Sequence, residues 1–464
     1  MASTDTQIGQ QGHTLTDWRP EDAQFWKKRG HSVAARNLWI SIPNLLLAFS
    51  VWMVWSVVVA KMPAIGFDFT VGQRFWLAAL PGLSGATLRI FYSFMIPIFG
   101  GRLWTTLSTA SLLAPAIGIG MAIQNPESSY NMFLILALLC GFGGGNFASS
   151  MANIAYFYPK KTKGNALALN AGLGNAGVSV MQFLVPIVIT TGVFGAIGGA
   201  PQQLSDGGQL WLQNAGYIWV PFIVISALAA WFGMNDIADA KASLSDQMSI
   251  LRRRHNWIMC ILYTGTFGSF IGYSAGFPLL MRTQFPDVDV LQYAFLGPLV
   301  GALSRAATGW VSDKFGGGRV TFWTFLCMII AVLGVITFLP LGDTAGNFWG
   351  FFACFMALFF LTGVGNASTF QMIPSIMRQE VPRLMPQLDE AATLKQSERE
   401  SSAIIAFTSA IAAYGAFFIP KAYGTSIAIT GGPAAALWFF LAFYVICVAI
   451  TWIFYSRKNA PVPC

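Results

Sequence analysis

Long apolar runs dominate this sequence, and their length decides the class of fold. A helix needs about 20 mostly apolar residues to cross a lipid bilayer. The 464-residue chain contains twelve such runs, near residues 38–60, 75–98, 103–123, 130–158, 164–192, 215–234, 256–280, 290–313, 319–340, 348–377, 402–427 and 434–455. Each run is far longer than a strand of a membrane barrel, so we predict an all-α integral membrane protein with twelve transmembrane helices.

Charged residues are scarce and unevenly placed. They make up 10% of the chain, against about 25% in soluble proteins, which excludes an ordinary soluble protein. Of the 27 Lys and Arg, 21 fall in the tails and in alternate loops on one side of the membrane, whereas the other side has Lys61, Arg74 and Arg282. Because basic loops stay in the cytoplasm, we place both termini there. The basic excess then needs no nucleic acid as a partner.

The sequence offers no set of groups for catalysis or for a cofactor. Its six cysteines form no Cys-x-x-Cys pair, which argues against a metal or redox site. We find no Ser-His-Asp set, phosphate-binding loop or cluster of metal ligands, so we predict no enzyme, no cofactor and no metal. All 19 carboxylates lie in tails, loops or the ends of runs, and none of the three histidines lies in the middle of a run.

The two halves of the chain repeat each other. Arg89 matches Arg305 at an offset of 216 residues, and Asn146 matches Asn366 at an offset of 220. Duplicated six-helix units are typical of secondary transporters. We therefore predict a cytoplasmic tail, a first six-helix bundle, a cytoplasmic linker, a second six-helix bundle and a cytoplasmic C-terminal tail, over residues 1–37, 38–234, 235–255, 256–455 and 456–464.

Several motifs resemble those of a known family. GWVSDKFGGGR at 309–319 resembles a loop motif of the major facilitator superfamily. Residues 143–186 contain GGGNFASSMANIAYFYPKK and NAGLGNAG, which resemble the signature of the nitrate/nitrite porters (NarK-like proteins) in that superfamily, and GVGNASTFQMI at 363–373 resembles its second-half counterpart. The resemblance implies the major facilitator fold and transport of nitrate and nitrite across a bacterial inner membrane. Pro97 stands in the first half where Asp313 stands in the second, so the latch role that the motif implies falls to Asp313.

Arg89 and Arg305 lie deep inside apolar runs. Each is 11 residues from the glycine that begins a cytoplasmic loop, Gly100 or Gly316, which at about 1.5 Å per residue is near the middle of a ~30 Å hydrocarbon core. A charge there costs at least about 2.5 kcal/mol on insertion scales, and no carboxylate lies at that depth. We predict that the counter-ion is the substrate, an anion. The alternative is that backbone carbonyls and water satisfy each arginine, or that it extends to an interface.

Two arginines from opposite halves could clamp one small planar oxyanion, because a guanidinium offers a planar fork of donors. Five further residues lie at a similar depth and, by the resemblance, match the positions at which such porters hold the anion: Asn175, Tyr263, Phe49, Phe147 and Phe267. Taken singly, an aromatic residue in a membrane span is more often a packing residue.

Other residues are candidates for gating or for packing. They are four glycines of the fifth run and two asparagines: Gly164, Gly172, Gly174, Gly177, Asn146 and Asn366. The glycines permit rocking between inward-open and outward-open states, or close helix packing. The asparagines suit helix contact equally well. Lys421, near the outer end of the eleventh run, attracts anions to the entrance or extends to the interface.

The spans carry no group in their middle that changes protonation near neutral pH, so we expect alternating access with exchange of nitrate for nitrite. Arg89 and Arg305 repel each other in an empty site, which disfavours closure without an anion. Proton-coupled nitrate symport is the alternative, and an anion channel or transceptor is a third possibility. We expect the chain to work as a monomer, with nitrate, nitrite and the lipid bilayer as its partners.

Overall fold

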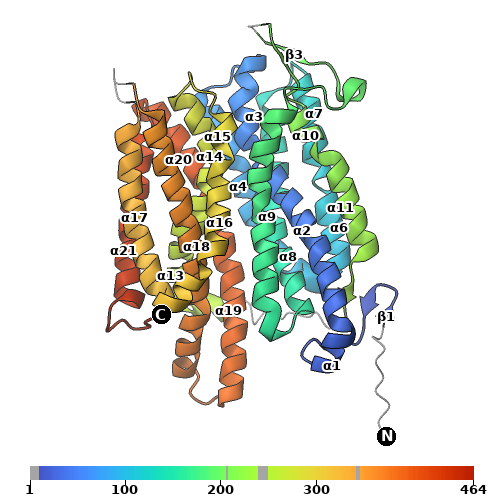
Figure 1. The fold of residues 1–464 in the computed structure, drawn as a ribbon, viewed down its shortest axis with the longest axis vertical. Coiled ribbons are helices and arrows are strands. Elements are labelled where there is room, and N and C mark those ends of the chain that lie inside the picture. Colours follow the sequence, from blue (N-terminus) through green and yellow to red (C-terminus); the bar gives the residue numbers. More distant parts are fainter. Residues whose placement is uncertain (1–9, 205–206, 239–248, 341–344) are drawn as a thin grey trace.

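The computed structural model describes residues 10–204, 207–238, 249–340 and 345–464. Its long helices run side by side in one bundle, and strand β1 and the C-terminus lie toward the same end of it (Figure 1). Within the described residues the helices form twelve spans. The predicted all-α membrane fold is therefore confirmed.

The first six spans are preceded by the short helices α1 Ala23–Phe25 and η1 Trp26–Gly30, and η2 Met62–Ile65 follows the first span. In chain order the six spans are α2 His31–Met53 with α3 Trp55–Lys61, α4 Val71–Tyr92 with α5 Met95–Phe99, α6 Gly101–Ala110 with α7 Leu113–Gln124, α8 Tyr130–Phe157, α9 Lys160–Val188, and α10 Asn214–Tyr217 with α11 Trp219–Gly233. We call these spans the first half.

The second half begins with η4 Ser249–Arg252. Its six spans are α13 Arg254–Tyr263 with η5 Thr264–Gly268 and α14 Ser269–Gln284, α15 Leu291–Ala294 with α16 Leu296–Phe315, α17 Gly317–Phe338, α18 Phe348–Leu384, α19 Glu390–Ala413 with α20 Gly415–Thr430, and α21 Ala434–Thr451 with η6 Trp452–Ser456. We call the end of the bundle at which α2, α9 and α17 begin the basic end, and the other the opposite end.

Ten helical segments are long and apolar enough to cross a membrane by length and composition alone. The two spans that fall outside this set are α4 and α16. Each carries an arginine within the helix, Arg89 in α4 and Arg305 in α16. The two most polar spans of the bundle are therefore the repeat-related pair that was singled out from the sequence.

Two helices extend further at the basic end than the apolar runs predicted. Helix α18 continues to Leu384 rather than ending near 377, and α19 begins at Glu390 rather than near 402. Their hairpin projects beyond the rest of the bundle (Figure 1). The side chain of Asp389 caps α19 by accepting a hydrogen bond from the amide of Ala392 at 2.7 Å. A count of apolar residues misses these turns because they are polar but still helical.

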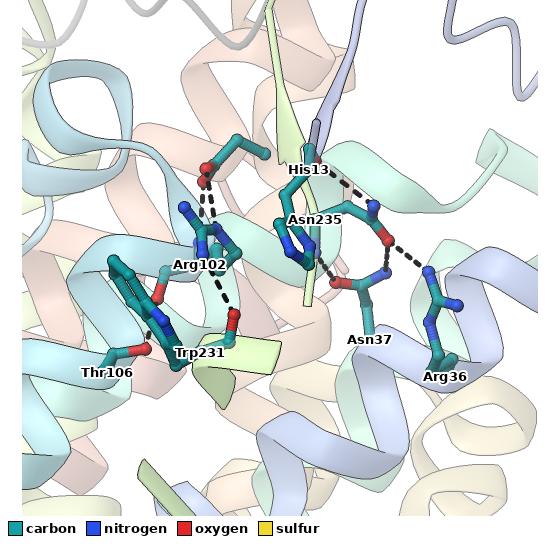
Figure 2. Close-up of polar contacts among 8 residues, drawn as sticks. His13, Arg36, Asn37, Arg102, Thr106, Trp231 and Asn235 are labelled. Carbon is teal, nitrogen blue, oxygen red and sulfur yellow. Dashed lines mark hydrogen bonds and ion pairs between the residues drawn. The ribbon is translucent and has the colours of Figure 1, made fainter. Parts of the chain in front are cut away.

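From residue 10 onward, the N-terminal tail is tied to the end of the first half. Asn235, just before the linker, accepts a hydrogen bond from Arg36 at 2.6 Å and donates one to the carbonyl of His13 at 3.2 Å (Figure 2). The amide of Asn235 also donates to Asn37 at 2.8 Å. Three short strands form a small sheet here: β1 Gln10–Gln11, β2 Thr14–Leu15 and β5 Asp236–Ile237. Strand β2 pairs with β1 in antiparallel and with β5 in parallel orientation.

The start of the linker is also tied to the third span. Asp236 accepts a hydrogen bond from the amide of Arg102 at 2.8 Å and pairs with the Arg102 guanidinium at 3.5 Å. Arg102 in turn donates to the carbonyl of Trp231 at 3.0 Å (Figure 2). The predicted linker covers 235–255, and its residues 239–248 lie outside the described part of the chain. At the opposite end, three short elements follow α9: η3 Gly195–Gly198, β3 Gln202–Gln203 and β4 Gln209–Leu210.

Glycine lets the backbones of α9 and α2 approach closely. A Cβ atom at Gly177 would overlap the carbonyl oxygen of Leu46, and one at Gly174 would meet the side chain of Leu45 at 2.5 Å. By contrast, a Cβ at Gly164 or Gly172 would meet nothing within 4 Å. The four glycine candidates of this helix therefore separate into two packing positions and two with open space.

This difference predicts opposite effects of alanine at two glycines of α9. Gly177→Ala places a methyl group against a fixed backbone carbonyl, and overpacking of this kind costs about 1–3 kcal/mol. Gly172→Ala, the matched control, has room for its methyl group and gains helix propensity of about 1 kcal/mol. We expect thermal unfolding in detergent to show a lower Tm for G177A and an equal or higher Tm for G172A. A lower Tm for both variants would contradict this packing.

Candidate functional site

Arg89 lies one turn before the end of α4 and is fully buried. Its Nε donates a hydrogen bond to the carbonyl of Gly144 at 3.0 Å, and its Nη1 donates to the carbonyl of Ser409 at 3.3 Å. Its Nη2 has no hydrogen-bond partner among the described residues. Backbone carbonyls thus satisfy part of this arginine, as the alternative reading of the sequence allowed, but one buried N–H2 group remains without an acceptor.

Aromatic rings surround the Arg89 guanidinium. Its central carbon lies 4.9 Å from the ring centre of Phe147, 5.3 Å from that of Trp52 and 5.7 Å from that of Phe267. Each contact of this kind stabilises a cation by about 0.5–2 kcal/mol. Phe267 and Ser409 belong to the second half, whereas Trp52 and Phe147 belong to the first. Arg89 therefore lies where the two halves meet.

Arg305 lies on α16, half-buried, with its central carbon 5.7 Å from the ring centre of Phe370. Its Nη1 is buried and, within the described chain, without a hydrogen-bond partner. The phenol of Tyr263 interacts electrostatically with both Arg305 and Arg89. This tyrosine therefore lies near both of the arginines that the sequence repeat relates.

The predicted aromatic residues fall into two groups around these arginines. Tyr263 and Phe267 stack with ring centres 5.4 Å apart and an angle of 17° between the rings. Phe267 lies in η5, a π-helical turn, and such turns are frequent at functional sites. Phe49 and Phe147 meet edge to face at 6.1 Å. The structure thus brings Phe147, Phe267 and Tyr263 to the arginines, with Phe49 behind Phe147.

The predicted asparagines are placed differently. Asn175 is buried on α9 between the packing glycines Gly174 and Gly177, and its Oδ1 has no partner in the described residues. Asn146 donates to the carbonyl of Ser108 at 3.5 Å, so its side chain points toward α6. Asn366 is buried on α18, next to Gly365, where a Cβ atom would meet Thr266 at 2.6 Å. The geometry of Asn146 and Asn366 therefore favours helix contact.

The ion pairs of the described residues lie away from this site. They are Arg19 with Asp17 and Asp22, Arg102 with Asp236, Lys160 with Glu398, Arg253 with Glu400, and Glu380 with His255 and Arg383. Neither Arg89 nor Arg305 forms an ion pair with any described carboxylate. The site is therefore a buried region with two positive charges, donors without partners among the described residues and surrounding aromatic rings, which suits a small anion.

The opposite end is closed by contacts between the two halves. A Cβ atom at Gly82 of α4 would overlap the backbone of Ala416 in α20, so these two helices touch through their main chains. The buried Gln182 of α9 donates hydrogen bonds to the Ser274 carbonyl of α14 at 2.8 Å and to the Ser56 hydroxyl of α3 at 3.2 Å. Nearer the arginines, Thr87 and Tyr414 share a hydrogen bond of 2.8 Å.

The basic end is held by a weaker contact. Lys160 of the first half pairs with Glu398 of the second at 2.8 Å, and 59% and 39% of their side chains are exposed. Asp313, predicted as a latch, is exposed and forms no ion pair within the described residues. Lys421 lies 4.8 Å from the ring centre of Trp76 and donates to the Thr425 hydroxyl at 3.1 Å.

Some residues of the site were not predicted from the sequence. Trp52, Ser409 and Phe370 contact the arginines, and Gln182 joins the halves. Trp52 and Phe370 are ordinary aromatic residues in apolar runs and give no sequence signal. Ser409 acts through its backbone carbonyl, which any residue would provide. Gln182 is a polar residue within the fifth run, and that polarity was the one available signal.

Comparison with known proteins assigns the fold and the family. The family model described as Major Facilitator Superfamily matches residues 44–420. Among solved structures, that of a D-xylose-proton symporter aligns with a TM-score of 0.66 at 14% identity, over 93% of this chain and 98% of that one. At this identity the likeness concerns the fold alone. The chain belongs to the major facilitator superfamily of membrane transporters.

Two relatives narrow this assignment. The chain is 52% identical to the nitrate/nitrite transporter NarU of Salmonella typhimurium, over 96% of this chain and 97% of that protein. It is 40% identical to the probable nitrate/nitrite antiporter NarK2 of Thermus thermophilus, over 98% of this chain and 99% of that protein. Within the superfamily, the chain therefore belongs to the NarK-like family of nitrate/nitrite porters.

The contacts at the two ends predict unequal effects of their removal. The hydrogen bonds of Gln182 are buried, and each such bond contributes about 0.5–1.5 kcal/mol, whereas a half-exposed ion pair such as that of Lys160 contributes about 0–1 kcal/mol. We expect Gln182→Leu to open the opposite end, and Lys160→Ala to leave it closed. Cysteines that replace Glu127 and Asp287 carry spin labels, after serine replaces the accessible Cys327, Cys354 and Cys464. Pulsed electron resonance then reports the distance between the halves at this end.

The expected result is a longer label distance in Q182L and an unchanged one in K160A. Gln182→Glu, a nearly isosteric variant, loses the amide donors and tests the hydrogen bonds separately from packing. An unchanged distance in both Gln182 variants would show that the amide does not hold this end.

Proposed function

We propose that this protein exchanges nitrate and nitrite across the membrane by alternating access. One observation carries the proposal: two arginines from opposite halves keep buried N–H groups that have no acceptor among the described residues, and neither pairs with a described carboxylate. A small planar oxyanion supplies both the missing acceptors and the missing charge. The names of the relatives, nitrate/nitrite transporter and probable nitrate/nitrite antiporter, support the same substrates and exchange.

In this proposal each site residue has a defined part. Arg89 and Arg305 clamp the anion with charge-assisted hydrogen bonds. Phe147 and Phe267 cover its flat faces and exclude water, and Phe49 supports Phe147 from behind. Tyr263 adds a hydroxyl near the two arginines, and Asn175 adds an amide. The contacts of Arg89, Phe147, Phe267 and Tyr263 described above support these assignments.

The proposed orientation places the basic end in the cytoplasm, because most Lys and Arg gather there. Both termini are then cytoplasmic, in the inner membrane of a bacterium. We retain the division into bundles at 38–234 and 256–455, with tails at 1–37 and 456–464 and a linker at 235–255, and a monomer as the functional unit. Contacts of α4 with α20 and of α9 with α16 then form the interface across which the bundles rock.

Obligatory exchange of nitrate and nitrite follows from the positive charges of Arg89 and Arg305. Two guanidinium groups without a counter-ion repel each other in a low dielectric, so the empty site resists closing. A bound anion removes this penalty and lets the halves rock from one side to the other. Rocking thus requires nitrate or nitrite in both directions, which is obligatory exchange. Proton-coupled symport is the alternative, in which water or the substrate carries the proton.

The arginine clamp predicts that lysine is a poor replacement. Arg89→Lys and Arg305→Lys keep the charge but lose the planar fork of donors. The loss of a charge-assisted hydrogen bond, about 1.5–3 kcal/mol, lowers nitrate/nitrite exchange in proteoliposomes by about tenfold to a hundredfold. Arg457→Lys, on the exposed C-terminal tail, is the control and keeps normal exchange. Normal exchange in R89K or R305K would refute the clamp.

The exchange mechanism predicts a requirement for anion on both sides of the membrane. Proteoliposomes loaded with nitrite should take up labelled nitrate, and those loaded with sulfate should not, at equal pH on both sides. Proton symport predicts instead that uptake needs no internal nitrite but depends on a pH gradient across the membrane. Uptake that proceeds without internal nitrite but stops when the pH gradient is removed would therefore favour symport over exchange.

A further inference from the structure

A crevice of about 680 Å³ lies between α20 and α21 in the part of the bundle near the opposite end. Its walls are apolar, with Phe418 and Phe439 on facing helices, and Thr264, Gly268 and Ser269 form its floor. Phe418 and Phe439 are 61% and 68% exposed, so in a bilayer they face lipid. The crevice exists because α21 packs mainly against α17, while α20 packs against α4 and α14.

The shape of the crevice distinguishes it from the rest of the lipid-facing surface. Its volume falls within the range of sites for small molecules, about 300–1,000 Å³, and it is concave and lined by residues of three spans. An apolar lining of this kind fits a hydrocarbon chain. A hydrophilic anion such as nitrate gains nothing from it, because the walls offer few polar groups.

One cation lies at this crevice. Lys421 is among its lining residues and forms no ion pair within the described residues. Its ammonium donates to Thr425, one turn closer to the opposite end, and lies over the ring of Trp76. Tryptophan is typical of the level of the lipid headgroups, and a lysine directed toward that level is placed to meet a phosphate.

We propose that this crevice binds one anionic phospholipid, with an acyl chain between α20 and α21 and its phosphate on Lys421. The hydrocarbon chain covers the apolar walls, and each CH2 group that it buries there stabilises binding by about 0.8 kcal/mol. The phosphate supplies the counter-charge that Lys421 lacks. Because Trp76 belongs to the first half and Lys421 to the second, the headgroup sits where helices of the two halves meet.

The proposal is tested by native mass spectrometry of the delipidated full-length protein in detergent. The probes are palmitoyl-oleoyl phosphatidylglycerol, which is anionic, and the matched phosphatidylcholine, which is zwitterionic. We expect one phosphatidylglycerol to bind at least ten times more tightly than phosphatidylcholine. Inorganic phosphate in millimolar excess should not displace it, since phosphate lacks the acyl chain.

Two variants and a control separate the parts of the site. Lys421→Gln should reduce the preference for phosphatidylglycerol at least fivefold. Ala435→Phe, at an exposed wall position, should weaken both lipids by filling the crevice. Lys61→Gln, a cation at the same end on α3 and away from the crevice, should change neither. Thermal unfolding checks that each variant is folded.

Equal binding of the two lipids by the unaltered protein would overturn the proposal, as would an unchanged preference in K421Q. Displacement of phosphatidylglycerol by inorganic phosphate would show that the lysine binds free anions and that the crevice holds no lipid. Nitrate exchange plays no part in these measurements, so their outcome is independent of the transport proposal.

Discussion

The positive charge of Arg89 is buried in a membrane-embedded protein, and much of the structure around it compensates for that burial. Two backbone carbonyls and three aromatic rings face the guanidinium. Each contact is modest, and an unpaired buried ion costs several kcal/mol. The surroundings therefore stabilise the charge enough for the protein to fold, while leaving it without the full negative partner that an anion provides.

Glycine gives Arg89 this environment. A Cβ atom at Gly144 would meet the indole of Trp52 at 2.6 Å and the Cα of Gly85 at 2.7 Å. Because there is none, α8 and α4 approach closely, the Gly144 carbonyl reaches Arg89, and the Trp52 ring fits between the helices. Trp52 is fixed there by its own hydrogen bond to the Pro81 carbonyl at 2.6 Å. The glycines of the fourth span thus matter because the absence of their side chains leaves room for Trp52 and for the close approach of α4.

The sequence points to the two arginines more directly than to the contacts between the halves. Counting residues from the loops singles out Arg89 and Arg305 because helix rise is constant and a lone charge in an apolar run is conspicuous. Gln182 and Ser409 escape this reasoning, since their roles depend on which helices of the other half lie opposite. The sequence also cannot distinguish Gly172 from Gly177, because both are glycines of the same apolar run. In the structure Gly172 faces open space, whereas Gly177 faces a backbone carbonyl. Helix α19 begins earlier than predicted because helical turns continue into solvent beyond the apolar run.

The parallel pairing of β2 with β5 also bears on how the protein is made. His13 and Asn235 meet across 222 residues of chain, and all six spans of the first half lie between them. Strand β2 can pair with β1 early, but it lacks its parallel partner β5 until the sixth span has been synthesised and inserted. Contacts that close so long a loop form late. Docking of this segment thus marks the completion of the first bundle, at the moment when the second begins to emerge from the ribosome.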